Sequence, residues 1–202
     1  MASVRSSWRR LLAVAAAVVV PGTGLADGAP PSVETLCAAC HGPGGNSVVP
    51  FFPRLAGQQA IYLEKQLRDF LAGKRKNDVM APVLEHIPEA DIPRIAAYYA
   101  AQAATPNKPD NEALVTAGQA IFNDGNTGTG VPACIGCHQP GGMGNERFPR
   151  LAGQHPAYAA AQLKAFKTGS RSNDKAKVMR TVAERLSDDE IAAVVEYLAT
   201  QP

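Results

Sequence analysis

The chain has 202 residues, of which 46% are hydrophobic and 19% are charged, and its formal net charge is +2 at pH 7. Three of the positive charges, on Arg5, Arg9 and Arg10, lie at the amino terminus with no acidic residue beside them, so the rest of the chain is close to neutral. A nucleic-acid-binding protein would show a basic patch or stripe. The charge pattern therefore gives no support to a nucleic-acid partner.

Residues 1–26 have the features of a secretory signal peptide. The basic start is followed by the apolar run Leu11–Val20, by the break at Pro21, and by small residues at Gly24 and Ala26. Ten apolar residues are too few for a membrane span, which needs about 20. No cysteine follows Ala26, which argues against a lipid anchor there. We predict cleavage after Ala26 and export to the periplasm by the general secretion route.

The remainder of the chain is a tandem repeat of one sequence unit. Phe52–Gln58 recurs letter for letter as Phe148–Gln154, at an offset of 96 residues. Periods of this kind indicate repeated structural units. The same register pairs further residues, and a three-residue insertion precedes the last of them: Tyr62 with Tyr158, Leu67 with Leu163, Phe70 with Phe166, Gly73 with Gly169, Asn77-Asp78 with Asn173-Asp174, Val79-Met80 with Val178-Met179, and Tyr98 with Tyr197.

The domain boundaries follow from this repeat. We predict a first domain at residues 27–103 and a second at residues 112–202. Between them, residues 104–111 are polar and hold Pro106 and Pro109, which is typical of a short, stiff linker.

The periodicity of apolar residues predicts helices and almost no strands. Helical spacing runs from 59 to 72 and again from about 156 to 167, and glycine follows the first of these helices at Gly73. A capping box at Ser187–Glu190 opens a final helix that continues to Leu198. The fold class predicted is all-α, with Gly- and Pro-rich loops elsewhere.

Two features should make the first domain differ from the second. A helix expected over residues 112–122 has only the short run 32–36 as its counterpart in the first domain. Pro93 falls in the first turns of the helix that ends the first domain, where it should remove a hydrogen bond and kink or shorten the helix.

The four cysteines occur as two Cys-x-x-Cys-His motifs, at Cys37–His41 and Cys134–His138, one in each repeat. This is the attachment signature of c-type haem, in which two thiols one helical turn apart bond the porphyrin vinyl groups and the histidine binds the iron. A zinc site would place its two pairs about 15–20 residues apart, whereas 93 residues lie between Cys40 and Cys134. A thioredoxin-like dithiol would not require a histidine after both pairs.

The sixth iron ligand must come from the remaining histidines and methionines. His86 and His155 are not duplicated, and Met143 follows His138 by only five residues, which places it on the proximal side. Met80 and Met179 form the one pair that the repeat preserves, each on an expected loop after a helix. We therefore predict that they are axial ligands, a coordination that raises the reduction potential and leaves no open site for oxygen or peroxide.

These motifs resemble the dihaem cytochrome c4 family, which has two Cys-x-x-Cys-His domains, a Pro-x-Leu-Ala-Gly-Gln motif and a distal methionine in each, and a short linker. The resemblance covers nearly all of the chain after the leader. It implies two tandem cytochrome c domains related by a pseudo-twofold axis, each wrapped around one covalent haem, with the propionate edges facing each other. It assigns Cys37, Cys40, His41 and Met80 to the first haem, and Cys134, Cys137, His138 and Met179 to the second.

Two further pairs of residues are expected near the haems. Metal-bound histidines usually donate their second ring nitrogen to a carbonyl, a carboxylate or water, and we expect Pro53 and Pro149 to supply that carbonyl. Arg54 and Arg150 lie inside the duplicated apolar motif. Because a carboxylate suits the arginine fork, we expect both near haem propionates.

The resemblance implies a periplasmic electron carrier, not an enzyme, that passes electrons from a quinol-oxidising complex to a haem–copper terminal oxidase. We expect a monomer that meets the membrane only loosely, through its partners, and a fixed two-domain body with fast transfer between the haems. A dihaem peroxidase needs one iron that can open, which the paired methionines argue against. An electron-accepting subunit of a dehydrogenase complex, such as a flavocytochrome, remains an alternative because its sequence would look almost the same.

Overall fold

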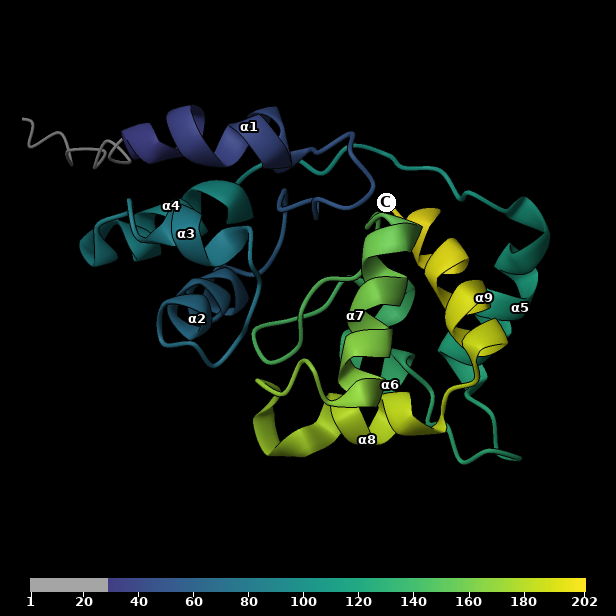
Figure 1. The fold of residues 1–202 in the computed structure, drawn as a ribbon. Helices are drawn as coiled ribbons and strands as arrows, with labels where there is room; N and C mark the ends of the chain where they lie inside the picture. The colour runs from purple at the N-terminus through teal and green to yellow at the C-terminus, as the bar shows by residue number, and fades with distance from the viewer. Residues whose placement is uncertain (1–28) are drawn as a thin grey trace, which may run out of the picture.

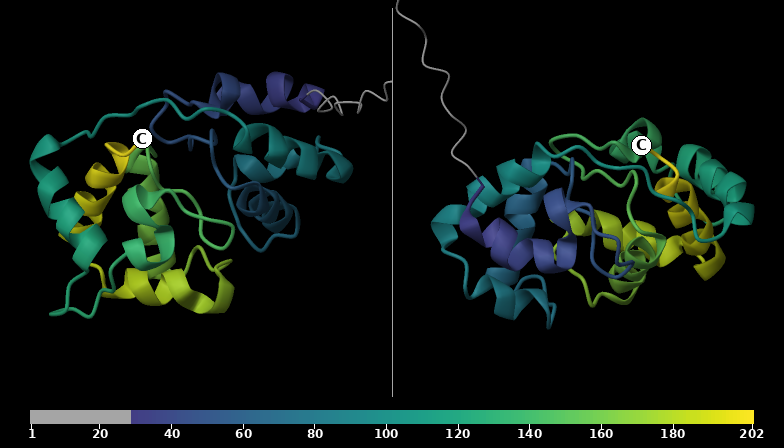
Figure 2. Two further views of the ribbon diagram at one scale, coloured as in Figure 1. Left: turned by 180° about the vertical axis from the view of Figure 1, so that it is seen from behind. Right: turned by 90° about the horizontal axis from the view of Figure 1, so that it is seen from above.

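The computed structural model describes residues 29–202, and the predicted signal peptide lies outside them. Two helical bodies lie side by side, one from α1 to α4 and one from α5 to α9, and the linker runs over both (Figures 1 and 2). In the described part of the chain, β-structure is limited to two isolated bridges, Asn126–Val131 and Asn145–Phe148. The predicted all-α fold is confirmed. None of the helices in residues 29–202 is long and apolar enough to cross a membrane.

The first domain is built around α2, which packs against α3 and α4. Its core includes Leu63, Phe70, Leu84, Ile95 and Tyr99. The helices of this domain are η1 (Val33–Cys37), α1 (Ala38–His41), η2 (Pro43–Gly45), α2 (Ala60–Leu71), α3 (Met80–Leu84), η3 (Glu89–Asp91) and α4 (Ile92–Ala100).

The second domain repeats this plan and adds a helix. The added α5 packs along α9, and Gly118 allows the close approach, because a Cβ there would lie 2.0 Å from the carbonyl oxygen of Ala193. The helices are η4 (Glu112–Leu114), α5 (Val115–Asp124), α6 (Ile135–His138), η5 (Pro140–Gly142), α7 (Pro156–Thr168), η6 (Lys175–Lys177), α8 (Val178–Arg185) and α9 (Asp188–Ala199).

The two domains begin differently, as the sequence predicts. In the first, one helical run from Pro31 leads through the π-helical η1 straight into the Cys-x-x-Cys-His turn at α1. In the second, α5 is a separate helix that ends at Gly125, whose φ of 73° suits glycine. Only the second domain therefore packs an amino-terminal helix of ten residues against its last helix.

The last helix of each domain also starts as expected. The capping box of α9 is present: Ser187 Oγ accepts from the N–H of Glu190, and the Glu190 carboxylate accepts from the N–H of Ser187. The first-domain helix α4 has 9 residues against the 12 of α9, so it is shorter. Pro93 is the second residue of α4 and follows the 3-10 turn η3, in which the N–H of Ile92 donates to the carbonyl oxygen of Glu89. Proline has no N–H with which to continue these helical bonds, in agreement with the sequence prediction.

The expectation that both predicted methionine ligands lie on loops is wrong. Met80 is the first residue of α3, and Met179 is the second residue of α8. The side chain of Asn77 accepts from the N–H of Met80 at 2.8 Å, and Asp174 accepts from the N–H of Arg180 at 3.1 Å. Helices of five and eight residues are too short to show a clear apolar period, so the sequence pattern does not predict them.

Candidate haem sites and the interface between the domains

The cysteines of both motifs lie in short helical turns that end at a histidine. All four are half-buried and form no disulfide. Burial raises the pKa of the Cys134 thiol to about 11 and also raises the pKa of Cys37. Redox-active cysteines usually have a lowered thiol pKa, which neither Cys37 nor Cys134 shows.

Each motif histidine is held by the proline that the sequence analysis paired with it. Nδ1 of His41 lies 2.8 Å from the carbonyl oxygen of Pro53, and Nδ1 of His138 lies 3.0 Å from that of Pro149. Burial lowers the pKa of both histidines, and the proline carbonyl only partly opposes this effect. A neutral imidazole that donates from Nδ1 presents Nε2 to a metal, so the geometry is suited to an iron ligand.

The remaining histidines and methionines lie in different surroundings. Met80 packs against the core of the first domain, and Met179 is half-buried. Met143 is 45% exposed and its sulfur accepts a hydrogen bond from Arg150, and His86 is exposed. His155 is buried at the interface, with Nε2 at 3.0 Å from the carbonyl oxygen of Ser47.

The duplicated Pro-Arg-Leu-Ala-Gly-Gln motif joins the two domains through reciprocal hydrogen bonds. Gln154 accepts from the N–H of Arg54 at 2.9 Å and donates to its carbonyl oxygen at 3.0 Å. Gln58 makes the same two bonds to Arg150, at 2.9 and 2.8 Å. Because equivalent residues exchange equivalent bonds, the domains are related by the predicted pseudo-twofold axis.

The two arginines of this motif meet across the interface. Arg54 donates to Asn46, to Thr105 and, at 3.1 Å, to the carbonyl oxygen of Gly153. Burial lowers the pKa of both guanidinium groups, and Arg150 lowers that of Arg54 further. Nε of Arg150 is buried without a hydrogen-bond partner. Two nearby guanidinium groups with an unused donor fit a site for carboxylates, which is what haem propionates would supply.

A second symmetric network lies between α2 and α7, and the sequence analysis missed it. Arg171 donates to Tyr62 at 2.9 Å, and Arg75 donates to Tyr158 at 3.0 Å. Each guanidinium also lies over a phenylalanine ring of its own domain, at 4.6 Å for Arg75 and 4.4 Å for Arg171. The glutamines Gln66 and Gln162 accept from both arginines.

The signal for this network was present in the sequence. Arg75 and Arg171, and likewise Gln66 and Gln162, obey the same 96-residue offset as the motif. A polar residue preserved on both copies of an apolar helix face indicates a shared polar interface.

The linker is fixed to both domains. Thr105 hydrogen-bonds to Asn46 in the first domain, and Asn107 donates to the carbonyl oxygens of Gly153 and Gln154 in the second. The buried carboxylate of Glu196 accepts from the N–H groups of Asp110 and Asn111, at 2.7 and 3.1 Å. These contacts hold the chain between the domains in one path.

Comparisons with known proteins agree with this site. The family model described as cytochrome c matches residues 26–102 and 115–202. Cytochrome c4 from Thiocapsa roseopersicina is 48% identical over 166 residues, covering 81% of this chain and 85% of that protein. A thiosulfate dehydrogenase electron acceptor from Thiomonas intermedia (strain K12) is 42% identical over 178 residues, covering 86% and 82%.

Solved structures show the same likeness. Reduced recombinant cytochrome c4 from Pseudomonas stutzeri superposes with a TM-score of 0.79 at 41% identity, covering 83% of this chain and 94% of that one. Thiosulfate dehydrogenase from Marichromatium purpuratum superposes with a TM-score of 0.76 at 39% identity, covering 82% of this chain and 36% of that one. The duplicated motifs, the symmetric interface and these relatives together show that the chain belongs to the cytochrome c4 family and is a dihaem electron-transfer cytochrome with two covalent haem c groups.

Proposed function

We propose that the protein is a periplasmic two-haem relay, in which an electron enters at one domain and leaves at the other. The proposed donor is a quinol-oxidising complex and the proposed acceptor is a haem–copper terminal oxidase. The observation that supports this most directly is the reciprocal bonding of Gln58 and Gln154, because it holds the two haem-binding domains in one orientation. Two carriers on a loose tether would not need it.

Haem iron supplies one-electron chemistry, and the residues of this chain set its conditions. His41 and His138 would hold the iron, and Pro53 and Pro149 fix the imidazole tautomer. Met80 and Met179 would be its further ligands, and thioether coordination of this kind raises the potential. Cys37, Cys40, Cys134 and Cys137 would attach the haems through thioether bonds, and Arg54 and Arg150 would stabilise propionate charges.

A second candidate function has a specific observation in its favour. Two relatives are named as electron acceptors of thiosulfate dehydrogenase, and a structural relative of which this chain covers 36% is itself a thiosulfate dehydrogenase. The alternative is therefore that this chain accepts electrons directly from a dehydrogenase.

Rapid-mixing kinetics separate these possibilities. The oxidised holoprotein would be mixed with a reduced quinol-oxidising complex and, separately, with thiosulfate dehydrogenase and thiosulfate. A fast reaction with only one of them identifies the donor class. Variants with serine in place of one cysteine pair, which disable one haem, test the relay. The relay fails if each remaining haem is reduced by the donor and oxidised by the acceptor as fast as in the intact protein.

A further inference from the structure

The two segments that carry the proposed methionine ligands have opposite charge. The α8 segment, residues 174–185, contains four basic and two acidic residues and has a net charge of +2. The matched α3 segment, residues 78–86, contains two acidic residues and no lysine or arginine, and has a net charge of −2 with its histidine neutral. The basic residues of the α8 segment are Lys175, Lys177, Arg180 and Arg185, and two of them come from the three-residue insertion that the first domain lacks.

Asp174, the acidic residue next to the insertion, does not neutralise the positive charge of the insertion at the surface. The side chain of Asp174 is only 4% exposed, and it accepts from Nε of Arg180 at 2.7 Å and from the Arg180 N–H at 3.1 Å. Lys175 and Lys177 are exposed, and neither takes part in an ion pair among residues 29–202. Arg185 donates to a backbone carbonyl at Gly130 instead of to a carboxylate. The positive charge of the segment therefore faces solvent.

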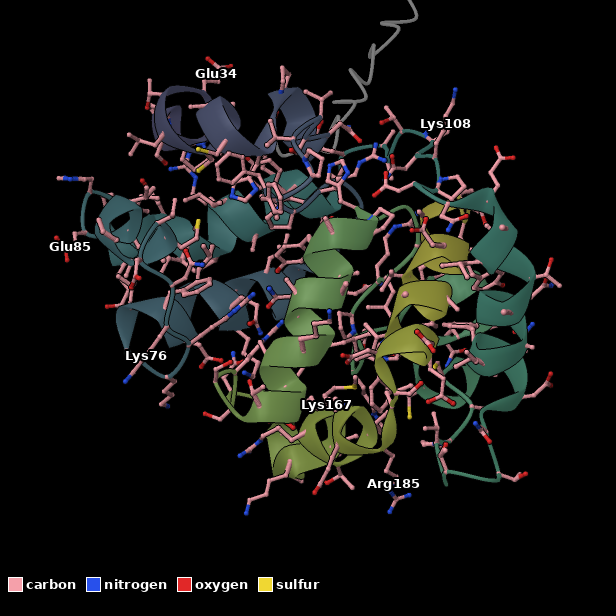
Figure 3. The ribbon with its side chains drawn as sticks, turned by 45° about the vertical axis from the view of Figure 1, so that its right-hand side comes forward. Glu34, Lys76, Glu85, Lys108, Lys167 and Arg185 are labelled. Carbon is pink, nitrogen blue, oxygen red and sulfur yellow. The ribbon has the colours of Figure 1, made fainter. Side chains whose placement is uncertain are left out.

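An apolar side chain lies within this basic surface. Val178, the residue before Met179, is 45% exposed. Protein interfaces commonly combine an apolar centre with a polar rim. Figure 3 shows Lys167 and Arg185 at the same end of the second domain, whereas Glu85 projects from the first.

We propose that the α8 segment is the docking surface for a redox protein whose own surface is acidic around its redox centre. The inference rests on the proposed electron-carrier function and adds the chemistry of one partner. Opposite charges steer such a partner towards Met179 and raise its association rate, whereas the α3 segment repels it from Met80. Lys74 and Lys76 precede the α3 segment and are exposed, and Lys74 lines the same hollow at the domain boundary as Lys65 and Lys175.

Small redox reagents of opposite charge test the local field directly. The reduced holoprotein would be oxidised at low ionic strength by anionic hexacyanoferrate(III) and by cationic tris(phenanthroline)cobalt(III), with the phases of the two haems resolved. In the variant Lys175→Glu/Lys177→Glu, one phase should become about tenfold slower with the anion and faster with the cation. Added salt should remove the difference.

A matched pair of variants makes the result specific. Asp78→Lys/Glu85→Lys reverses the charge of the α3 segment and should accelerate the other phase with the anion. The control Lys76→Glu/Lys108→Glu changes the total charge as much as Lys175→Glu/Lys177→Glu but lies outside residues 174–185. It should leave unchanged the phase that responds to Lys175→Glu/Lys177→Glu. The inference is overturned if the α8 and α3 variants alter the same phase, or if all three variants act alike. No electron exchange with either reagent would instead refute the carrier function.

A protein probe completes the test. A reduced cupredoxin with an acidic isoelectric point, added to isotope-labelled holoprotein, should shift the amide resonances of residues 174–185 and lose this effect with Lys175→Glu/Lys177→Glu. Shifts confined to the first domain would overturn the inference. So would binding of the segment to phosphatidylglycerol vesicles in place of the cupredoxin, because the surface would then recognise lipid.

Discussion

The two domains share the residues that hold a haem and differ in the residues that surround it. Both have the Cys-x-x-Cys-His turn, the proline carbonyl on the histidine and the glutamine that reaches across the interface. They differ in the added helix α5 and in the insertion before Met179. We therefore expect residues that obey the repeat to serve the cofactor and the symmetric interface, and unrepeated residues to set the stability of each half and the surface it presents.

The largest effect is expected from removing one proposed axial ligand at a time. Met80→Ala and Met179→Ala should each remove about half of the long-wavelength methionine-to-iron charge-transfer band of the oxidised protein and lower the potential of one haem. Optical spectra and redox titration would measure this. Met143→Ala is the control and should keep the whole band, because Met143 is exposed and bonded to Arg150. Full retention of the band in either ligand variant would refute its assignment.

The added helix predicts a stability effect confined to the second domain. Gly118→Ala would place a Cβ about 2.0 Å from the carbonyl oxygen of Ala193, so α5 must move away from α9. The cost should be about 3 kcal/mol of the free energy of unfolding, at the upper end for overpacking. Chemical denaturation followed at each haem would show it. Ala117→Ser on the exposed side of α5 should cost much less, and equal loss in both domains would contradict the comparison.

The interface offers a test of the symmetry itself. Gln58→Ala and Gln154→Ala each remove two hydrogen bonds to a backbone across the interface. Because partly buried amide groups lose their partners, each change should cost about 2 kcal/mol. Small-angle scattering and internal electron-transfer rates should report looser domains. If one substitution had no effect while the other separated the domains, the bonds of Gln58 and those of Gln154 would not be equivalent.

Much of the fold and of the site was readable from the sequence because the repeat acts as an internal comparison. The regular apolar spacing predicts a helix over 59–72, and α2 is observed over Ala60–Leu71. The apolar pattern does not predict the helices at Met80 and Met179, whose first turns are bonded to the side chains of Asn77 and Asp174. The contacts of Arg75 with Tyr158 join residues far apart in the chain, which periodicity within one helix does not reveal.

A smaller effect on stability should depend on pH and should come from His155, on the second-domain side of the interface. His155 and Gln59 occupy matched positions, and each contacts the other domain, at Ser47 and Met143 respectively. Burial lowers the pKa of His155, and the nearby charge of Arg54 lowers it further. The Ser47 carbonyl and Asp110 raise it, but they do not cancel the effect of burial. Near pH 6.5 His155 binds a proton more readily in the unfolded chain than in the folded chain. The free energy of unfolding should therefore fall as the pH drops below about 6.5. The fall should stop below the lowered folded pKa.

The variant His155→Gln isolates this contribution, because it gives the second domain the residue of the first. The difference in unfolding free energy between variant and parent should change between pH 7 and pH 5 in the direction that favours the variant at low pH. A difference that does not vary with pH would show that His155 titrates alike in the folded and unfolded chains.

The smallest effect is expected at the insertion. Ala176 and Lys177 have φ angles of 53° and 60°, the left-handed region that non-glycine residues avoid at a cost of about 1–2 kcal/mol each. Ala176→Gly relieves one of these costs but adds backbone freedom to the unfolded chain, so a net gain of about 0.5 kcal/mol is expected. Ala117→Gly in α5 should instead lose about 1 kcal/mol, because its backbone is helical. Denaturation midpoints of the two variants should therefore move in opposite directions. Movement in the same direction would mean that the strained turn beside Met179 is not held by the rest of the domain.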